Sequence, residues 1–518
     1  MYQITEMFFR RRECMSFNPT DEQYAIINWQ GQQLVVNAFA GTGKTSTLVQ
    51  FARASPDSRM LYLAYNRAIR DEAERKFPFN VECKTSHQLA YARVGRHYRH
   101  RLVPGLRITD VARKLNTRYW ALARVAGTGL NHFICSADTV PGLHHLPDKD
   151  EMRGVPPADA LRAVQLLWNE MSNPGGTFPV THDTYLKLFQ LSGADLSHRW
   201  DIILFDEAQD ANPVTTALVL GQKCRVVLVG DRYQQIYRFR GANNALSHPA
   251  LKNADRLWLT QSFRFGPAVA RMANLLLQRE GETREVKGCG GDDEVLLKCH
   301  AREHLQGHYT VLSRTVAGVI GTALMAAMKG QKVYWVGGIE GYRTGELEDL
   351  YWFQVDMPER MHSDRLRRDY RNFEEYKYIA KSTKDVEMNQ SLRLLELCFP
   401  LPKKLELLRQ YTVTNEQDAD ITVSTAHRSK GLEWPIVMLD EDFQDITDPL
   451  MTEAERHDET CLLYVAVTRA LRTLVLNDLM HQLAEEAGRD EQNQKVADAS
   501  PSEDGENDTV YGQEDENA

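Results

Sequence analysis

The clearest chemical signature in the chain is a glycine-rich turn that follows an apolar run at Val35–Thr45, within LVVNAFAGTGKT. A strand, a glycine-rich turn and a helix start, in that order, form a cradle for phosphate groups. Because Gly41 and Gly43 have no Cβ, backbone N–H groups around them can approach phosphate oxygens. Lys44 then reaches the β- and γ-phosphates, and the Thr45 hydroxyl coordinates Mg²⁺. The spacing therefore predicts a site for a nucleoside triphosphate.

The pattern departs from its usual form at Ala38, which stands where the first glycine normally does. An ordinary strand-to-helix turn is the alternative interpretation, and partners elsewhere in the chain must decide between the two. The loop residues that we expect to bind the nucleotide are Ala40, Gly41, Thr42, Gly43, Lys44, Thr45 and Ser46.

Two adjacent carboxylates supply such a partner. In IILFDEAQD, four apolar residues form a buried strand that ends in Asp206 and Glu207. The first carboxylate after such a strand holds Mg²⁺ through water, and the second polarises the attacking water. We therefore expect Thr45 and Asp206 to form the metal site, and Glu207 to be catalytic.

Four further residues are suited to a nucleotide. The Gln23 amide offers a donor and an acceptor, which matches the N6/N7 edge of adenine. Phe263 could stack on adenine, Gln234 could sense a γ-phosphate, and Arg264 could supply charge to it. Taken alone, Gln23 would be a solvated residue at a helix start, but its place ahead of the phosphate loop favours a role in binding.

Polar and aromatic residues at other strand ends are candidates for contacts to nucleic acid. Tyr65 and Asn66 follow one apolar strand, and Thr85 and His87 follow the next. Small polar groups suit contacts to the phosphate backbone, and an aromatic ring can stack on a base. Helix N-caps and packed side chains explain these residues equally well at this stage.

Two aromatic residues follow another buried strand. Tyr237 and Phe239 lie two residues apart, so both rings project to one side of an extended segment. They could be stacking platforms for bases or two core aromatics. Arginines between 93 and 107, interleaved with Tyr91 and Tyr98, similarly fit a single-strand track or a solvated helix face.

Charge is unevenly distributed along the 518 residues. The formal net charge is −9, but residues 484–518 alone carry −10, which leaves +1 for the rest of the chain. The body therefore has room for local basic surfaces, whereas 483–518 is expected to be a disordered acidic tail. Solubility is the simplest role for this tail; mimicry of DNA phosphates and contacts to protein partners are alternatives.

The cysteines and apolar segments point to a reducing, aqueous setting. The eight cysteines form no CxxC pair, which argues against a zinc site and a disulfide framework. No stretch approaches the roughly 20 apolar residues of a membrane span, and the N-terminus lacks an export signal. We expect a cytoplasmic protein that contacts no membrane and is associated with a bacterial or phage nucleoid.

The alternation of apolar strands and helices predicts an α/β fold with two parallel-sheet cores, each interrupted by a mainly helical insertion. Within the first core, Leu257–Gly266 is expected to be one strand. The expected boundaries are 1–90 and 200–268 for the first core, 91–199 for its insertion, 269–338 and 419–482 for the second core, 339–418 for its reduced insertion, and 483–518 for the tail.

Taken together, the motifs resemble those of superfamily 1A DNA helicases of the UvrD/Rep/PcrA type, which are P-loop NTPases. They are AFAGTGKT, DEAQD, VGDRYQQIYRFRGA, LTQSFRFG, VSTAHRSKGLEW and YVAVTRA, in this order. The wording looks closest to the F-box DNA helicase branch, although we expect no F-box ahead of Gln23. The resemblance spans about Phe17 to Leu476, and it implies two RecA-like domains with ATP between them and single-stranded DNA across their tops.

The resemblance also implies roles that the residues alone do not establish. Arg469 would be an arginine finger from the second core, and Glu433 would contact the ribose or help to close the cleft. Gln234 and Arg264 would contact the γ-phosphate from the first core. The DNA path would be lined by Tyr65, Thr85, His87, Tyr237, Phe239, Thr425 and His427.

The implied function is an ATP-dependent translocase or helicase that moves 3′ to 5′ on single-stranded DNA. It would act as a monomer at single-strand/duplex junctions, in repair, recombination or replication. Phe239 stands where many relatives have Trp, and the second insertion is short, so translocation is better supported than strand separation. A nucleotide-switched module that gates a partner effector and an RNA-acting relative are the alternatives.

Overall fold

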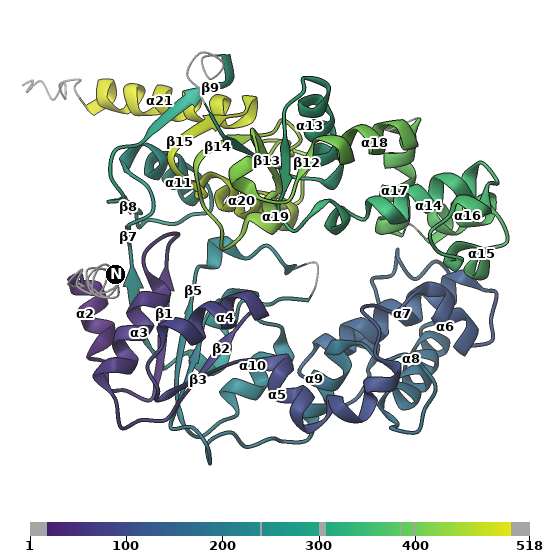
Figure 1. Cartoon of the computed structure of the whole chain (residues 1–518). Helices are drawn as coiled ribbons and strands as arrows, with labels where there is room; N and C mark the ends of the chain where they lie inside the picture. Colours follow the sequence, from purple (N-terminus) through teal and green to yellow (C-terminus); the bar gives the residue numbers. More distant parts are fainter. Residues whose placement is uncertain (1–17, 239–240, 300–306, 384, 398–399, 499–518) are drawn as a thin grey trace, which may run out of the picture.

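The computed structural model describes residues 18–238, 241–299, 307–383, 385–397 and 400–498 (Figure 1). Two parallel sheets, each flanked by helices, form two cores, and the first core lies below the second in Figure 1. The expected fold class, two parallel α/β cores with helical insertions, is confirmed.

The first core contains six parallel strands. They are β1 (Gln33–Ala38), β2 (Met60–Ala64), β3 (Val81–Thr85), β4 (Ile202–Phe205), β5 (Arg225–Gly230) and β6 (Asp255–Leu259). Their order in the sheet is β3-β2-β4-β5-β1-β6. Parallel strands bring their carboxyl ends to one edge of the sheet, so the loops after β1, β2, β3, β4 and β5 lie near one another.

Helices cover both faces of this sheet, which explains why its inner strands β2, β4 and β5 are apolar on both sides. One face packs against α2 (Asp21–Ile27), α3 (Lys44–Ala54) and α4 (Arg67–Lys76). The other packs against α5 (Ser86–Arg93), α9 (His182–Leu191) and α10 (Pro213–Leu220). Along β1, Leu34 and Val36 face the first group of helices, whereas Val35 faces the second.

The second core contains seven parallel strands. They are β9 (Glu294–Leu297), β10 (Tyr309–Ser313), β11 (Val333–Trp335), β12 (Thr412–Val413), β13 (Ile421–Thr425), β14 (Trp434–Leu439) and β15 (Ala470–Leu476). Their order is β12-β11-β13-β10-β14-β15-β9. The associated helices are α11 (Pro267–Arg279), α13 (Val316–Met328), α19 (Ala426–Ser429), α20 (Glu453–Val467) and α21 (Asp478–Asp498).

One apolar cluster spans both cores and fixes their contact. Phe39 and Tyr233 of the first core and Tyr464 of the second belong to it. The ring centroid of Tyr233 lies 6.3 Å from the ring centroid of Phe39 and 6.3 Å from that of Tyr464. Because this cluster includes the residue that follows β1, the carboxyl edge of the first sheet faces the second core.

Each core carries a helical insertion. The first lies between β3 and β4 and includes α6 (Ile108–Lys114), α7 (Trp120–Cys135), α8 (Pro157–Ser172) and α9. The second lies between β11 and β13 and includes α14 (Thr344–Gln354), α15 (Arg365–Asp369), α16 (Phe373–Thr383), α17 (Val386–Leu397) and α18 (Leu401–Tyr411). The two insertions meet on the right of Figure 1, where Arg107 pairs with Asp369 at 2.9 Å.

Short 3₁₀ helices complete the structure. They are η2 (Gly95–Arg101), η3 (Leu143–His145), η4 (Ala208–Asp210), η5 (Arg232–Gln234), η7 (Ala245–Ser247), η8 (Pro249–Leu251), η9 (Ile339–Tyr342), η10 (Pro358–Arg360) and η11 (Glu416–Asp418). Two of them, η4 and η5, follow β4 and β5 at the carboxyl edge of the first sheet and carry residues of the candidate site.

The expectation of one strand at Leu257–Gly266 is wrong. β6 ends at Leu259, and β7 (Gln261–Ser262) pairs instead with β8 (Lys287–Gly288) in a separate two-stranded sheet. A Cβ on Gly288 would lie 2.1 Å from the Gly266 carbonyl oxygen, so the two segments pass too closely for any side chain there. Beyond Leu259 the chain therefore pairs with β8 instead of continuing along the first sheet.

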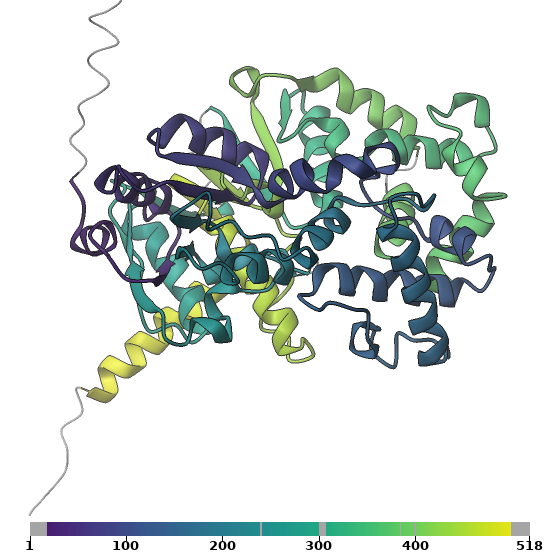
Figure 2. The same cartoon turned by 90° about the horizontal axis from the view of Figure 1, so that it is seen from below.

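The expectation of disorder from residue 483 is wrong over 483–498. This segment belongs to α21, which projects from the body of the molecule (Figure 2, yellow). Met480 and Leu483 are buried in the apolar cluster that spans both cores, and Arg279 pairs with Glu486 at 3.0 Å. These contacts anchor the start of the helix, which local composition does not reveal. Residues 499–518 lie outside the described residues.

Candidate functional site

The phosphate loop connects β1 to α3 and has glycine at its tightest points. Gly41 (φ +74°) and Gly43 (φ +77°) adopt left-handed backbone conformations. A Cβ on Gly41 would lie 2.5 Å from the Ser262 hydroxyl oxygen. Ala38 ends β1 and is not among the residues with positive φ, so alanine is accommodated at that position. α3 begins at Lys44, which places the free N–H groups of its first turn at the loop.

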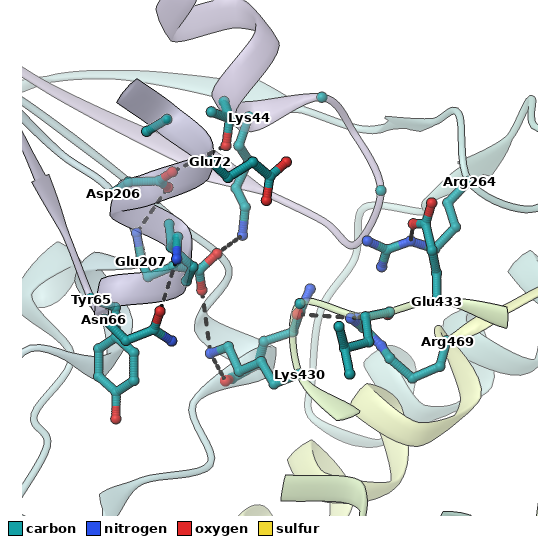
Figure 3. Close-up of a pocket in the computed structure, with 18 of the residues that line it drawn as sticks. Lys44, Tyr65, Asn66, Glu72, Asp206, Glu207, Arg264, Lys430, Glu433 and Arg469 are labelled. Atoms are coloured by element: carbon teal, nitrogen blue, oxygen red, sulfur yellow. Dashed lines mark hydrogen bonds and ion pairs between the residues drawn. The ribbon is translucent and has the colours of Figure 1, made fainter. Parts of the chain in front are cut away.

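Two carboxylates follow β4 directly and lie beside the loop (Figure 3). Oδ2 of Asp206 accepts hydrogen bonds from the hydroxyls of Thr45 (3.2 Å) and Tyr62 (2.7 Å). Nζ of Lys44 lies 3.0 Å from Oε1 of Glu207. Glu207 has φ +52°, a strained conformation of the kind found at functional sites. Thr45 and Asp206 thus present adjacent oxygen atoms, which fits a hard cation such as Mg²⁺.

The two carboxylates differ in acidity. Burial and the nearby charge of Glu207 raise the pKa of Asp206. Burial would also raise the pKa of Glu207, but the ammonium groups of Lys44 and Lys430 outweigh it and hold this pKa well below its usual range. A carboxylate with such a low pKa is a weak base. Glu207 therefore becomes a stronger base when a lysine leaves it.

Lys430 reaches this carboxylate from the second core. It follows α19, and its Nζ lies 3.3 Å from Oε2 of Glu207. The same ammonium pairs with Asp210 and donates to the Gln234 carbonyl at 2.7 Å. Burial would lower the pKa of Lys430, but the two carboxylates outweigh this effect and raise it. Lys430 is thus a charged contact between the second core and the acidic residues of the first.

Arg469 is a second cation from that core, and it is buried. Its guanidinium donates to Oε1 of Gln234 (3.3 Å) and to the carbonyls of Leu432 (3.1 Å) and Val465 (2.9 Å). Burial and the charge of Arg264 lower the pKa of Arg469 to about 9. The contact to Gln234 joins Arg469 to the first core.

A cavity of about 700 Å³ between the cores brings most of the predicted nucleotide-site residues together (Figure 3). Those that line it are Gly41, Thr42, Gly43, Lys44, Thr45, Ser46, Asp206, Glu207, Gln234, Phe263, Arg264, Glu433 and Arg469. Within it, Nε of Arg264 pairs with Oε2 of Glu433 at 2.7 Å. Their individual contacts to nucleotide remain predictions.

Two of the predicted nucleotide-site residues, Gln23 and Ala40, are not among those that line the cavity. Nε2 of Gln23 donates to the Thr42 carbonyl (3.4 Å), and its Oε1 accepts from the Thr20 N–H (3.2 Å). The N–H of Ala40 donates to the Tyr464 hydroxyl (3.2 Å). The hydrogen bonds of Thr42 and Ala40 hold the loop in place, and contacts of Gln23 to adenine and of Ala40 to nucleotide stay predictions.

Aromatic residues predicted to line the DNA path meet where the two cores come together. The rings of Tyr65 and Tyr237 are stacked, with centroids 5.3 Å apart and an interplanar angle of 16°. The Tyr237 hydroxyl donates to the His427 carbonyl at 3.1 Å. Phe239, predicted to join them, lies outside the described residues. The centroid of the His427 ring, in the second core, lies 6.4 Å from that of the Tyr237 ring, so rings from both cores form a surface of the kind that bases stack on.

The polar residues predicted for the DNA path have structural contacts. Asn66, Thr85 and Thr425 are N-caps whose side chains accept backbone N–H groups of α4, α5 and α19, respectively. Nε2 of His87 lies 3.1 Å from Oδ1 of Asp183. The caps at Asn66 and Thr85 match the alternative interpretation of the sequence. Binding of DNA by the four residues stays a prediction.

Sequence analysis did not assign a role to Lys430, Asp210 or Tyr62. The first two lie inside quoted motifs, SKGLEW and DEAQD, but their pairing joins positions 220 residues apart. Tyr62 lies in an apolar strand, where a buried aromatic residue usually indicates packing. The sequence does contain one signal for this pair. Asp210, the second aspartate of DEAQD, follows a buried strand closely, and a buried carboxylate requires a partner.

A separate cluster in the first insertion has the residue types of a metal site. Side chains of Asp138, His144 and His145 converge there. However, the N–H of Gly142 donates to Nδ1 of His145 (3.0 Å), so a neutral His145 carries its proton on Nε2, the atom that faces Asp138. A metal ion would have to displace that proton, and we assign no metal to this cluster.

Comparison with protein families places matches in both cores. Residues 180–253 match the UvrD/REP helicase N-terminal domain, and residues 309–479 match the UvrD-like helicase C-terminal domain. The first match includes Asp206, Glu207 and Gln234, and the second includes Lys430 and Arg469. The two matched segments therefore meet at the cavity between the cores.

Individual relatives give the same picture. The chain is 32% identical over 511 residues to F-box DNA helicase 1 of Gallus gallus. This match covers 90% of this chain and 50% of the chicken protein. It is 32% identical over 508 residues to F-box DNA helicase protein 1 of Schizosaccharomyces pombe, covering 90% and 58%, respectively. DNA helicase IV of Escherichia coli is 26% identical over 343 residues, covering 52% and 48%.

The chain spans about half the length of the curated relatives it matches. Among the described residues, no helix combines the length and apolar character needed to cross a bilayer. Both relatives that match over most of the chain are eukaryotic proteins, so association with a bacterial or phage nucleoid finds no support in them.

Proposed function

The chain belongs to the UvrD-like helicases, and from this we propose that it is a DNA-dependent ATPase that moves 3′ to 5′ along single-stranded DNA. One observation carries the proposal. In the cavity between the cores, Lys44 and Glu207 of the first core meet Lys430 and Arg469 of the second. A site built from two bodies can convert nucleotide binding and hydrolysis into their relative motion.

The contacts around Glu207 suggest how hydrolysis begins. Lys44 is paired with Glu207 in this structure, and phosphate oxygens over the loop would draw its ammonium away. The carboxylate would then be free of one cation and able to orient and deprotonate the attacking water. Thr45 and Asp206 would hold Mg²⁺, which neutralises negative charge on the phosphates when bound.

Gln234 provides a route from the nucleotide to the second core. Its Oε1 accepts from Arg469, and its Nε2 donates to Asp231 at 2.7 Å. Arg469 would stabilise charge on the transferred phosphoryl group, as an arginine finger does. Loss of the γ-phosphate would remove the ligand shared by both cores, and the cores would then move relative to each other. Tyr65, Tyr237 and His427 would move with them and advance along the DNA.

Several finer features belong to the same proposal. The protein would act as a monomer at single-strand/duplex junctions and use the motion for unwinding or for displacement of bound proteins. Repair, recombination or replication would be its setting, and protein partners would bind the acidic C-terminal tail. Direction and setting follow from the family resemblance alone.

Steady-state ATP hydrolysis with and without a single-stranded DNA oligomer tests this function. We expect strong stimulation by DNA, which disappears in Glu207→Gln because the base is lost while the shape of the side chain is kept. An RNA oligomer of the same sequence should stimulate less. Hydrolysis that is indifferent to DNA would contradict the proposal and favour a nucleotide-switched module.

A further inference from the structure

The proposed reaction makes no use of Asp210, although this residue lies beside the site. Asp210 is the last residue of η4, the short helix that directly follows Asp206 and Glu207, and its side chain is fully buried. Oδ2 pairs with Lys430, but Oδ1 has no hydrogen-bond partner among the described residues. Burial raises the pKa of Asp210 to about 6, and Lys430 offsets part of this effect. A buried oxygen without a partner is costly and calls for a functional explanation.

Lys430 is shared between Asp210 and Glu207. Its Nζ lies 3.3 Å from Oε2 of Glu207 while it pairs with Oδ2 of Asp210. A buried ammonium group is stable only while it has an acidic partner. Lys430 can therefore leave Glu207 without leaving the site, because Asp210 can keep its charge paired.

The same lysine also faces the predicted DNA side. Its Nζ lies 5.8 Å from the centroid of the Tyr237 ring, which stacks on Tyr65. A cavity of about 290 Å³ is lined by these two tyrosines and by Glu207 and Asp210. A base that stacks on Tyr237 would shift the ring, and with it the cation–π contact to Lys430. Room for such a shift is already present.

We propose that Asp210 is a positioning residue that takes Lys430 from Glu207 when single-stranded DNA engages Tyr237. Glu207 is then released from its second cation, so that its Oε2 is open to accept a hydrogen bond from the attacking water. This inference rests on the proposed function and supplies the link by which DNA stimulates hydrolysis.

Asp210→Asn tests the link, because asparagine keeps the shape of the side chain but does not hold the lysine by charge. We expect the DNA-stimulated kcat to fall about tenfold. The basal kcat without DNA and the KM for ATP should stay close to those of the wild type. A merely structural role for Asp210 would change the basal rate and KM together with the stimulated rate.

Asp201→Asn is the matched control. Asp201 immediately precedes β4, and its Oδ1 accepts from Nη2 of Arg59 at 2.8 Å, away from both cavities. Its replacement also removes one carboxylate from an ion pair of the first core. Both the basal and the DNA-stimulated rates should be retained in this variant.

The double variant Asp210→Asn/Lys430→Gln tests whether Asp210 acts through Lys430. If it does, adding Asp210→Asn to Lys430→Gln should lower DNA stimulation no further. The double variant buries no unpaired charge, so this comparison also serves if Asp210→Asn alone fails to fold. A further loss of stimulation in the double variant would overturn the proposal.

The outcomes separate this inference from the proposed function. If DNA stimulates hydrolysis by Asp210→Asn as strongly as it stimulates the wild type, the role of Asp210 is overturned and the proposed DNA-dependent ATPase function still stands. Lack of DNA stimulation in the wild type overturns the proposed function, and the role of Asp210 with it.

Discussion

Arg469→Lys tests whether the second core takes part directly in hydrolysis. The arginine side chain is almost completely buried, at 1% exposed, and its nitrogens donate to Gln234, Leu432 and Val465. Lysine keeps the positive charge but is a point charge that cannot reach these acceptors together. We expect the variant to bind ATP nearly as well as the wild type, because the loop and Lys44 remain, and to hydrolyse it poorly.

The structure separates the expected loss of turnover from the expected loss of stability. An arginine finger contributes on the order of 10³-fold to turnover, which corresponds to ~4 kcal/mol in the barrier. The carbonyls of Leu432 and Val465 lose good donors, at about 1 kcal/mol each. The free energy of unfolding should therefore fall by only ~2 kcal/mol.

Single-turnover hydrolysis at saturating ATP and DNA measures the first quantity, and urea unfolding measures the second. Arg225→Lys is the matched control, because Arg225 also donates to two carbonyls, of Gly31 (2.9 Å) and Trp29 (3.2 Å), outside the cavity. It should lose similar stability and keep its turnover. Turnover of Arg469→Lys within about tenfold of the wild type would refute the assignment.

Three further predictions address the first core and its insertion. Lys44→Ala should abolish turnover with little change in melting temperature, because the ammonium faces the cavity and pairs with Glu207; retained ATPase activity would remove Lys44 from the mechanism. Tyr62→Phe should raise the Mg²⁺ concentration for half-maximal hydrolysis about tenfold, since Asp206 loses an orienting hydroxyl at 2.7 Å. An unchanged Mg²⁺ titration would show that this hydroxyl does not orient the carboxylate. Burial lowers the pKa of Lys187 from 10.5 to about 8, so the unfolded chain binds this proton more tightly and stability rises with pH between these values. The free energy of unfolding of the wild type relative to Lys187→Met should thus increase by ~3 kcal/mol over that range, and a difference that stays constant with pH would contradict this.

The parts of the site that depend on neighbouring residues were predictable from the sequence. A glycine-rich turn after an apolar run predicts the loop at Gly41 and Gly43, because few other arrangements require left-handed glycines there. Asp206 and Glu207 follow an apolar run directly, so their place at a strand end required no tertiary information. The alternation of strands and helices likewise indicated two parallel cores.

Features that depend on distant packing could not be predicted in the same way. The pairing of Lys430 with Asp210 exists only because two cores meet, and neither residue type indicates its partner. Thr85 and Thr425 have the residue type expected both for a phosphate contact and for a helix N-cap, and only coordinates show the cap. The start of α21 is held by Met480 and Leu483, two apolar residues too few to form a recognisable period.

The most direct test of the account is ATP-driven movement along single-stranded DNA. Streptavidin on a biotin at the 5′ end of an oligomer lies in the path of a 3′-to-5′ motor, whereas streptavidin at the 3′ end does not. We predict ATP-dependent release of streptavidin from the 5′ end, little release from the 3′ end, and none with Glu207→Gln. Release from neither end, or from the 3′ end alone, would contradict the account.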